Sequence, residues 1–212
     1  MALLASLVHL ATSTPAGLPH TSNLLKSVGI RAEDIQVIPG PGLPSLESVG
    51  LTAVGIYEEA LRRQNDPSIE AAIHAELDAE FASNNSTATT PIAARNNPYR
   101  FMHIRATACA IYLNELGNTP CAVVSARCTV MCQSTDTHGE WATISGFTHD
   151  VPSSSSYCRH VARMVESVRD VCNTDGYTAK FGTDAAYGNG HFRVEVIGQL
   201  GPTCWTKFQF GK

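Results

Sequence analysis

The clearest periodic pattern in the sequence lies between residues 153 and 172. Cysteines and valines recur at spacings of three and four residues, which places them on one stripe of a helix: Cys158, Val161, Val165, Val168 and Cys172. Charged residues fall mostly on the other side, and the serines before Tyr157 are suitable N-cap residues. We therefore predict an amphipathic helix with a cysteine near each end, stopped at Gly176.

A strand pattern follows, in which apolar residues alternate with polar ones: Phe192, Val194 and Val196 with His191, Arg193 and Glu195. A period of two puts the apolar set on a buried face and the polar set on the opposite face. Asn189-Gly190 just upstream favours a turn.

The remaining segments of the second half complete the predicted fold. Residues 121–132 read as a central strand, and residues 140–147 are expected to pair back on it. Residues 177–182 and 204–210 also favour strands, whereas residues 99–116 fit a helix or a strand. This order predicts an α+β fold with one helix packed across an antiparallel sheet.

The first hundred residues show weaker patterns. Residues 17–50 are rich in Gly, Pro and Ser and are expected to be irregular, whereas residues 51–63 and 68–81 have helical periodicity. Residues 2–11 are apolar over the length of a signal-peptide core, although no Lys or Arg precedes them. The alternative for this segment is a short buried helix.

These patterns divide the chain into three parts. We expect a signal peptide at residues 1–16, a cysteine-free leader or pro-region at residues 17–97 and a cysteine-rich α+β domain at residues 98–212. Arg62-Arg63 and Arg95 are candidate processing sites. Alternatively, the N-terminal helices pack permanently on the cysteine-rich domain, and the dibasic pair is an ordinary part of a helix surface.

Cysteine placement is the most informative feature of the composition. All seven cysteines lie between Cys109 and Cys204, which is typical of a disulfide framework in an oxidising compartment. Structural zinc is the alternative, but Cys128-x-x-x-Cys132 has no second close pair. We therefore expect a secreted chain, in which Asn84 and Asn85 are candidate glycosylation sites.

The connectivity of the cysteines stays open at this point. Six are candidates for disulfides: Cys121, Cys128, Cys132, Cys158, Cys172 and Cys204. Cys109 is a candidate for the odd thiol. The helix cysteines would lie about 21 Å apart and the two strand cysteines about 13 Å apart, so neither pair can bridge itself. Our best expectation bonds Cys128 and Cys132 to Cys158 and Cys172, with Cys204 as the rival partner.

Charge and motifs exclude several classes of function. The net charge is −4 and the sequence has no Lys/Arg block, so nothing predicts a polyanion-binding surface. No apolar run is long enough to span a bilayer. The sequence contains no Walker loop, Rossmann fingerprint, nucleophile elbow or HExxH motif, and we predict no cofactor and no metal.

The polar face of the predicted strand is the first candidate site. His191, Arg193 and Glu195 supply an acid, a base and a cation that could support phosphodiester cleavage, with His138, His149 or His160 as a partner. The alternative is an ordinary solvated face with an ion pair.

The loop at residues 183–190 is the second candidate. Gly and Asn dominate it, and a loop on a rigid scaffold can carry recognition. We name Asp184, Tyr187 and Asn189 as candidate binding residues. The alternative is a plain hairpin connection.

The run from Cys158 through Cys172, followed by a Gly-containing turn and an alternating strand, resembles small secreted cysteine-rich proteins of fungi, including killer toxins and necrosis-inducing effectors. The resemblance covers residues 121–204. It implies a disulfide-stapled helix-on-sheet sandwich, an extracellular location, and a protein or cell-surface target on a host or competitor. It carries over no functional residue.

We therefore expect a secreted effector or toxin-like protein that acts by binding. One alternative is a small secreted hydrolase, in particular a ribonuclease that uses His191, Arg193 and Glu195, and only this alternative has a nucleic-acid partner. Another is a non-toxic extracellular interaction domain.

Overall fold

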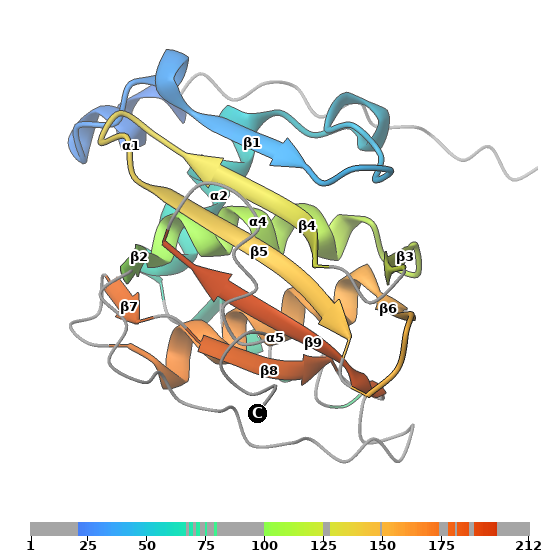
Figure 1. Ribbon diagram of the computed structural model, residues 1–212. Helices are drawn as coiled ribbons and strands as arrows, with labels where there is room; N and C mark the ends of the chain where they lie inside the picture. The colour runs from blue at the N-terminus through green and yellow to red at the C-terminus, as the bar shows by residue number, and fades with distance from the viewer. Residues whose placement is uncertain are drawn as a thin grey trace, which may run out of the picture.

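A five-stranded antiparallel sheet forms one layer of the fold (Figure 1). Its strands lie in the order β1 (Gln36–Pro39), β4 (Thr129–Thr135), β5 (Trp141–Thr148), β9 (Asn189–Ile197) and β8 (Gly182–Ala186). Two short ladders pair β2 (Arg100–Met102) with β7 (Thr178–Lys180), and β3 (Pro120–Val123) with β6 (Ser154–Tyr157). This computed structural model describes residues 21–66, 68–69, 71–72, 75, 79, 100–124, 128–148, 150–173, 178–180, 182–186 and 189–198.

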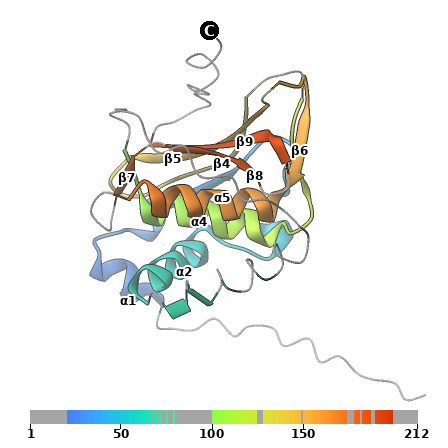
Figure 2. The same ribbon diagram turned by 90° about the horizontal axis from the view of Figure 1, so that it is seen from below.

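Helices form two further layers on one side of this sheet (Figure 2). The helices α4 (His103–Glu115) and α5 (Cys158–Val171) lie side by side against the sheet. Beyond them lie α1 (Thr21–Ser27) and α2 (Ala53–Asn65), of which α2 packs on α4. Two 3-10 turns, η1 (Ala32–Asp34) and η2 (Glu47–Val49), flank β1 in the sequence.

The α+β fold class is confirmed, with an antiparallel sheet, helices packed against it and disulfides. The stripe predicted for α5 is also confirmed, because Cys158, Val161, Val165 and Val168 are at most 1% exposed. The expectation of one packed helix is wrong, since α4 lies beside α5. Every residue from His103 to Leu113 is buried, so α4 has no polar face and gives no clear periodic signal.

The expectation of one strand at residues 121–132 is also wrong. Only β3 and β4 are strands there, and β3 pairs with β6 outside the main sheet. The tip at residues 183–190 is shorter than expected, because β8 extends to Ala186 and β9 begins at Asn189. The strand expected at residues 204–210 lies outside the described residues.

The N-terminal segment is part of the same fold. Residues 17–50 were expected to be irregular, but β1 pairs with β4 from Gln36↔Thr135 to Pro39↔Cys132. The helix predicted at residues 51–63 is confirmed as α2, which buries Ile56, Tyr57, Ala60 and Leu61. Whether residues 17–97 are removed as a pro-region stays a prediction. Such a removal would uncover the β4 edge and one side of α4.

A buried ion pair fastens α4 to the β4–β5 hairpin. The guanidinium of Arg105 donates through Nε and Nη2 to both carboxylate oxygens of Asp136, at 3.0 and 2.8 Å, and both side chains are fully buried. Its Nη1 donates to Glu140 Oε2 at 2.7 Å, but Glu140 is 65% exposed. Burial, together with the charge of Asp136, raises the pKa of the neighbouring Tyr57 hydroxyl.

We expect Asp136→Asn to lower the free energy of unfolding by about 3 kcal/mol, because it leaves the buried Arg105 charge without its main counterion. Urea unfolding at neutral pH with intact disulfides measures the loss. Glu140→Gln is the control and should cost less than about 1 kcal/mol, since that carboxylate faces water. Equal losses in the two variants would contradict a dominant role for the buried pair.

A substitution at Gly40 would show how much the contact between β1 and β4 contributes to the stability of the fold. The Gly40 N–H donates to Met131 O at 2.9 Å, and a Cβ at this position would overlap the carbonyl of Val130 in β4. Gly40→Ala should therefore cost about 2 kcal/mol, because backbone rather than a flexible side chain must move. The control is Gly190→Ala, whose Cβ would meet open space. Similar melting temperatures for both variants would show that β1 is dispensable.

Candidate functional site

The catalytic residues expected from sequence lie on β9, and their alternation is confirmed. Phe192, Val194 and Val196 face the helices and are fully buried. On the opposite face, His191 is exposed, Arg193 is half-buried and Glu195 is fully buried. The three side chains therefore lie on the same face of β9 but differ in their exposure to solvent.

Glu195 lies in the middle of a cross-strand row. It is opposite Ser145 on β5 and Thr183 on β8, and all three residues are buried. The hydroxyls of Ser145 and Thr183 find no hydrogen-bond partner among the described residues. His191 lies about 13 Å from Glu195 along the strand. An enclosed carboxylate this far from the exposed imidazole is poorly placed to act with it on a polymeric substrate.

The binding residues expected near the β8–β9 tip are only partly described. Asn189 turns toward β6, where its Nδ2 donates to Ser154 Oγ at 2.8 Å and to Ser155 O at 2.7 Å. Its Oδ1 accepts from the His191 N–H at 3.0 Å. Asn189 therefore ties the hairpin to β6. The side chain of Asp184 and all of Tyr187 lie outside the described residues.

The neighbouring β3–β6 ladder presents an apolar side to solvent. We call this side the tip surface, which consists of Pro120, Ala122, Val124, Ser155 and Tyr157. Val124 is 64% exposed and Tyr157 is 46% exposed. The Tyr157 ring packs edge-on against His160, with centroids 5.3 Å apart, and the Arg159 guanidinium lies 5.9 Å from its centre. Sequence analysis missed Tyr157, because it follows the serines that predicted the helix start.

The tip surface has a rigid support. Directly beneath it, Cys121 of β3 is bonded to Cys158, the first residue of α5, and both are fully buried. The first N–H groups of α5 are also held, because Cys158 N donates to Thr119 O at 3.0 Å and Arg159 N to Gly117 O at 3.1 Å. These bonds fix the orientation of Tyr157 relative to the sheet.

The connectivity expected from sequence is wrong. Cys132 is bonded to Cys109 of α4 rather than to α5, and Cys158 is bonded to Cys121. Cys109 is therefore not the odd thiol, and Cys172 is a buried thiol. Cys128 is disulfide-bonded, while Cys204 lies outside the described residues. The expectation failed because α4, which supplies Cys109, was not recognised as a helix packed on β4.

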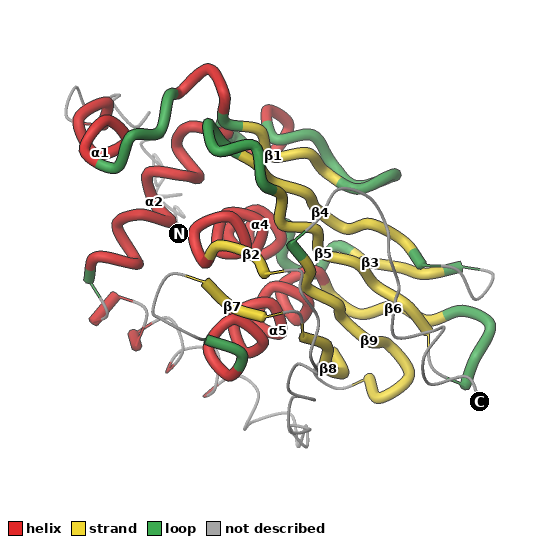
Figure 3. Tube along the Cα trace, turned by 60° about the vertical axis from the view of Figure 1, so that its left-hand side comes forward, coloured by secondary structure: helices red, strands yellow, loops and turns green. Residues whose placement is uncertain are grey.

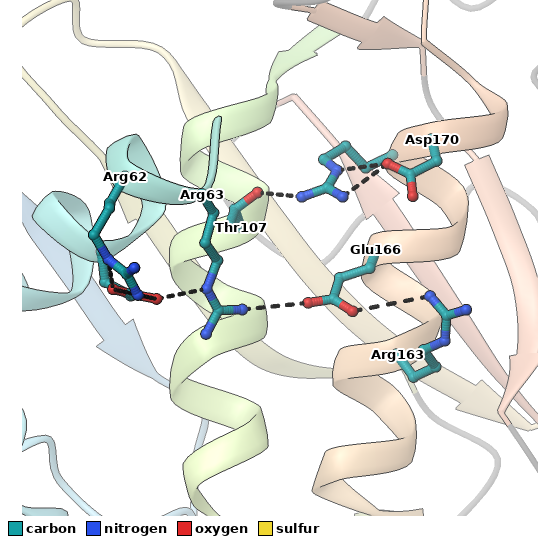
Figure 4. Close-up of polar contacts among 8 residues, drawn as sticks. Arg62, Arg63, Thr107, Arg163, Glu166 and Asp170 are labelled. Carbon is teal, nitrogen blue, oxygen red and sulfur yellow. Dashed lines mark hydrogen bonds and ion pairs between the residues drawn. The ribbon is translucent and has the colours of Figure 1, made fainter. Parts of the chain in front are cut away.

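A charged cluster joins α2, α4 and α5 on the side of the helices away from the sheet (Figure 4). Glu59 of α2 accepts hydrogen bonds from Arg62 and Arg63. Arg63 Nη1 lies 3.6 Å from Glu166 Oε1, and Arg163 Nη1 lies 4.0 Å from Glu166 Oε2. Beside them, Arg169 donates to Thr107 Oγ1 at 2.7 Å and pairs with Asp170.

This cluster bears on the candidate processing site. Arg62 and Arg63 lie in the last turn of α2, and the Arg63 side chain is only 12% exposed. A protease that needs an extended substrate would first have to unwind this turn and break the contact with Glu166. Processing itself stays a prediction, and Arg95, Asn84, Asn85 and residues 1–16 lie outside the described residues.

Glu166 is the most perturbed acid of the cluster. Burial raises its pKa to about 7, against the opposing charges of Arg63 and Arg163. The pKa of Glu59 moves the other way. Burial would raise it, but hydrogen bonds from Arg63 and Arg62 bring it below its usual range. Sequence analysis placed Glu166 on the charged side of the helix, and it left open whether the N-terminal helices pack on this domain.

The other candidate histidines do not gather around His191. His138 is exposed in the β4–β5 turn, where its N–H donates to Asp136, and His160 packs on Tyr157. His149 lies outside the described residues. Within the described ranges, no cluster of His, Cys, Asp or Glu has the arrangement of a metal site. No helix there has the length and apolar character needed to cross a membrane.

The raised pKa of Glu166 predicts that the stability of the fold depends on pH. The folded chain holds this proton up to about pH 7, whereas a Glu in the unfolded chain releases it near its ordinary pKa of 4.5. Stability should therefore fall as pH rises from about 4.5 to about 7, by up to about 3 kcal/mol. Urea unfolding across this range measures it.

Glu166→Gln should flatten this part of the stability profile, because the group no longer titrates. Glu115→Gln removes one exposed carboxylate and should leave the profile unchanged. A parent chain that is equally stable at pH 5 and pH 8 would contradict the assignment.

Comparison with known proteins gives one match. The model of a family described as a domain of unknown function (DUF8794) matches residues 95–198, just under half of the 212 residues. The match begins before β2 and ends after β9, and it leaves out α1, β1 and α2. No curated protein and no solved structure matches the chain. From β2 to β9, the chain is thus similar to a family whose function is itself undefined.

Proposed function

We propose that the chain is a secreted effector or toxin-like protein that acts by binding a protein target on a host or competitor cell. The observation that carries this proposal is the pair of fully buried disulfides in the core. Cys109–Cys132 fastens α4 to β4, and Cys121–Cys158 fastens the start of α5 to β3. Cytosolic proteins rarely keep such bonds, whereas secreted proteins commonly do.

The tip surface is the part of the structure that best suits recognition. Exposed aromatic side chains on a rigid support lose little conformational entropy on binding and often carry much of the binding energy. Tyr157 has this character, since it is held by the β3–β6 ladder, by Arg159 and His160 and by the disulfide below. We assign it the central contact with the target.

The ribonuclease alternative draws less support from the geometry. General acid–base cleavage needs two groups that reach the same phosphodiester. Glu195 is enclosed and His191 is exposed further along β9, so this pair lacks such an arrangement. A non-toxic interaction domain would use the same tip surface and would differ only in its effect on the target cell.

We expect Tyr157→Ala to weaken binding of the fluorescently labelled protein to target cells about tenfold or more, because the mutation removes the main exposed aromatic contact. Flow cytometry on intact cells of a plant host and of a competing yeast measures the binding. The melting temperature should change little, since almost half of the side chain is in water.

Val171→Ala is the matched control, because Val171 is 52% exposed and lies at the far end of α5. It should bind like the parent chain. Parent-like binding by Tyr157→Ala would contradict the proposed surface. RNA cleavage by the purified chain that is lost in His191→Ala would favour the ribonuclease instead.

A further inference from the structure

A cavity of about 360 Å³ opens between α1, η1 and α2. The helices α1 and α2, which contribute to its lining, lie on the side of the molecule opposite β3 and β6 (Figure 3), so the cavity is separate from the tip surface. Its volume is at the lower end of the range for small-molecule sites, about 300–1,000 Å³. A site of this size suits a single-chain ligand rather than a large cofactor.

The local sequence explains the apolar floor of the cavity. Helix α1 ends at Ser27, and Gly29 just beyond it has a φ of +73°, which lets the chain reverse. Ile30 N then donates to Leu25 O at 3.0 Å, which brings the two apolar residues together. Leu25 is 2% exposed and Ile30 is 6% exposed, and the partly buried Val54 of α2 completes the lining.

The rim of the cavity carries both cations and carboxylates, and these are only partly paired with one another. Arg31 is paired with Asp34 through contacts of 2.5 and 2.6 Å. Lys26, Glu33 and Glu58 also line the cavity. Neither Lys26 nor Glu33 forms an ion pair with another described residue. Lys26 thus lines the same cavity as the apolar residues Leu25 and Ile30.

We propose that this cavity is a binding site for a small amphipathic monocarboxylate. The apolar chain of the ligand packs on Leu25, Ile30 and Val54, and its carboxylate pairs with Lys26. Glu33 on the same rim repels a second negative charge, so a dicarboxylate of equal length binds less well. This site is independent of the proposed target recognition.

The test titrates the ¹⁵N-labelled full-length chain with decanoate below its micelle-forming concentration. Saturable amide shifts centred on residues 24–33 and 52–58, with a dissociation constant below about 1 mM, are the expected result. Decanol, decanedioate and decyltrimethylammonium should each bind more weakly, and acetate should not bind. Absence of shifts, shifts centred elsewhere, or equal affinity for decanoate and decanol would overturn the proposal.

Variants separate the two parts of the site. Lys26→Gln should weaken decanoate binding about fivefold, the effect of one surface charge pair, without changing the affinity for decanol. Lys26→Arg should retain decanoate binding. Val54→Phe should fill the cavity and weaken both ligands, and its spectrum shows whether the fold is intact.

Arg62→Gln removes a cation that does not line the cavity and should bind decanoate like the parent chain. An equal loss of decanoate affinity in Arg62→Gln and Lys26→Gln would mean that only the net charge of the chain affects binding. This result would contradict the assigned contact between Lys26 and the ligand carboxylate.

Discussion

The burial of α4 on all sides from His103 to Leu113 is the constraint on which the rest of the structure depends. A helix without a solvent face needs cover from several directions, and here the sheet, α5 and α2 supply it. Each polar side chain on such a helix must find a partner inside the protein. Arg105 is paired with Asp136, Thr107 accepts from Arg169, and the Tyr112 hydroxyl donates to Pro44 O at 2.6 Å. These partners come from three different parts of the chain, so α4 acts as the centre on which they assemble.

This constraint also gives the N-terminal segment a structural role. The similarity to the family of undefined function begins at residue 95, yet α2 and Pro44 lie earlier in the sequence and complete the surroundings of α4. In this chain, part of the surface of the family-like region is therefore covered by residues outside it. The pairing of β1 with β4 extends the same relationship to the sheet, whose edge it occupies. Packing and covalent processing are separate matters, because a segment can be cleaved from its neighbour and still remain bound.

Sequence patterns were informative where one side of an element meets solvent or polar groups. The α5 stripe, the alternation of β9 and the helix α2 could all be predicted, because apolar and polar residues separate cleanly in each. The patterns failed at α4, which is buried all round, and at β1, whose four residues are too few to establish a period. Prediction of the candidate site was limited in the same way. Alternation placed Glu195 correctly on its face, but it could not show that this face is enclosed at Glu195 and open at His191.

The two described disulfides interlock along the chain, because Cys121 lies inside the loop closed by Cys109–Cys132, and Cys132 lies inside the loop closed by Cys121–Cys158. A single backbone cut at any point between Cys109 and Cys158 thus leaves both pieces covalently joined. For a protein exposed to digestive enzymes, this arrangement means that nicking does not by itself release a fragment. At least two cuts, or one cut together with reduction of Cys109–Cys132, would be needed to separate the central helix from the rest of the molecule.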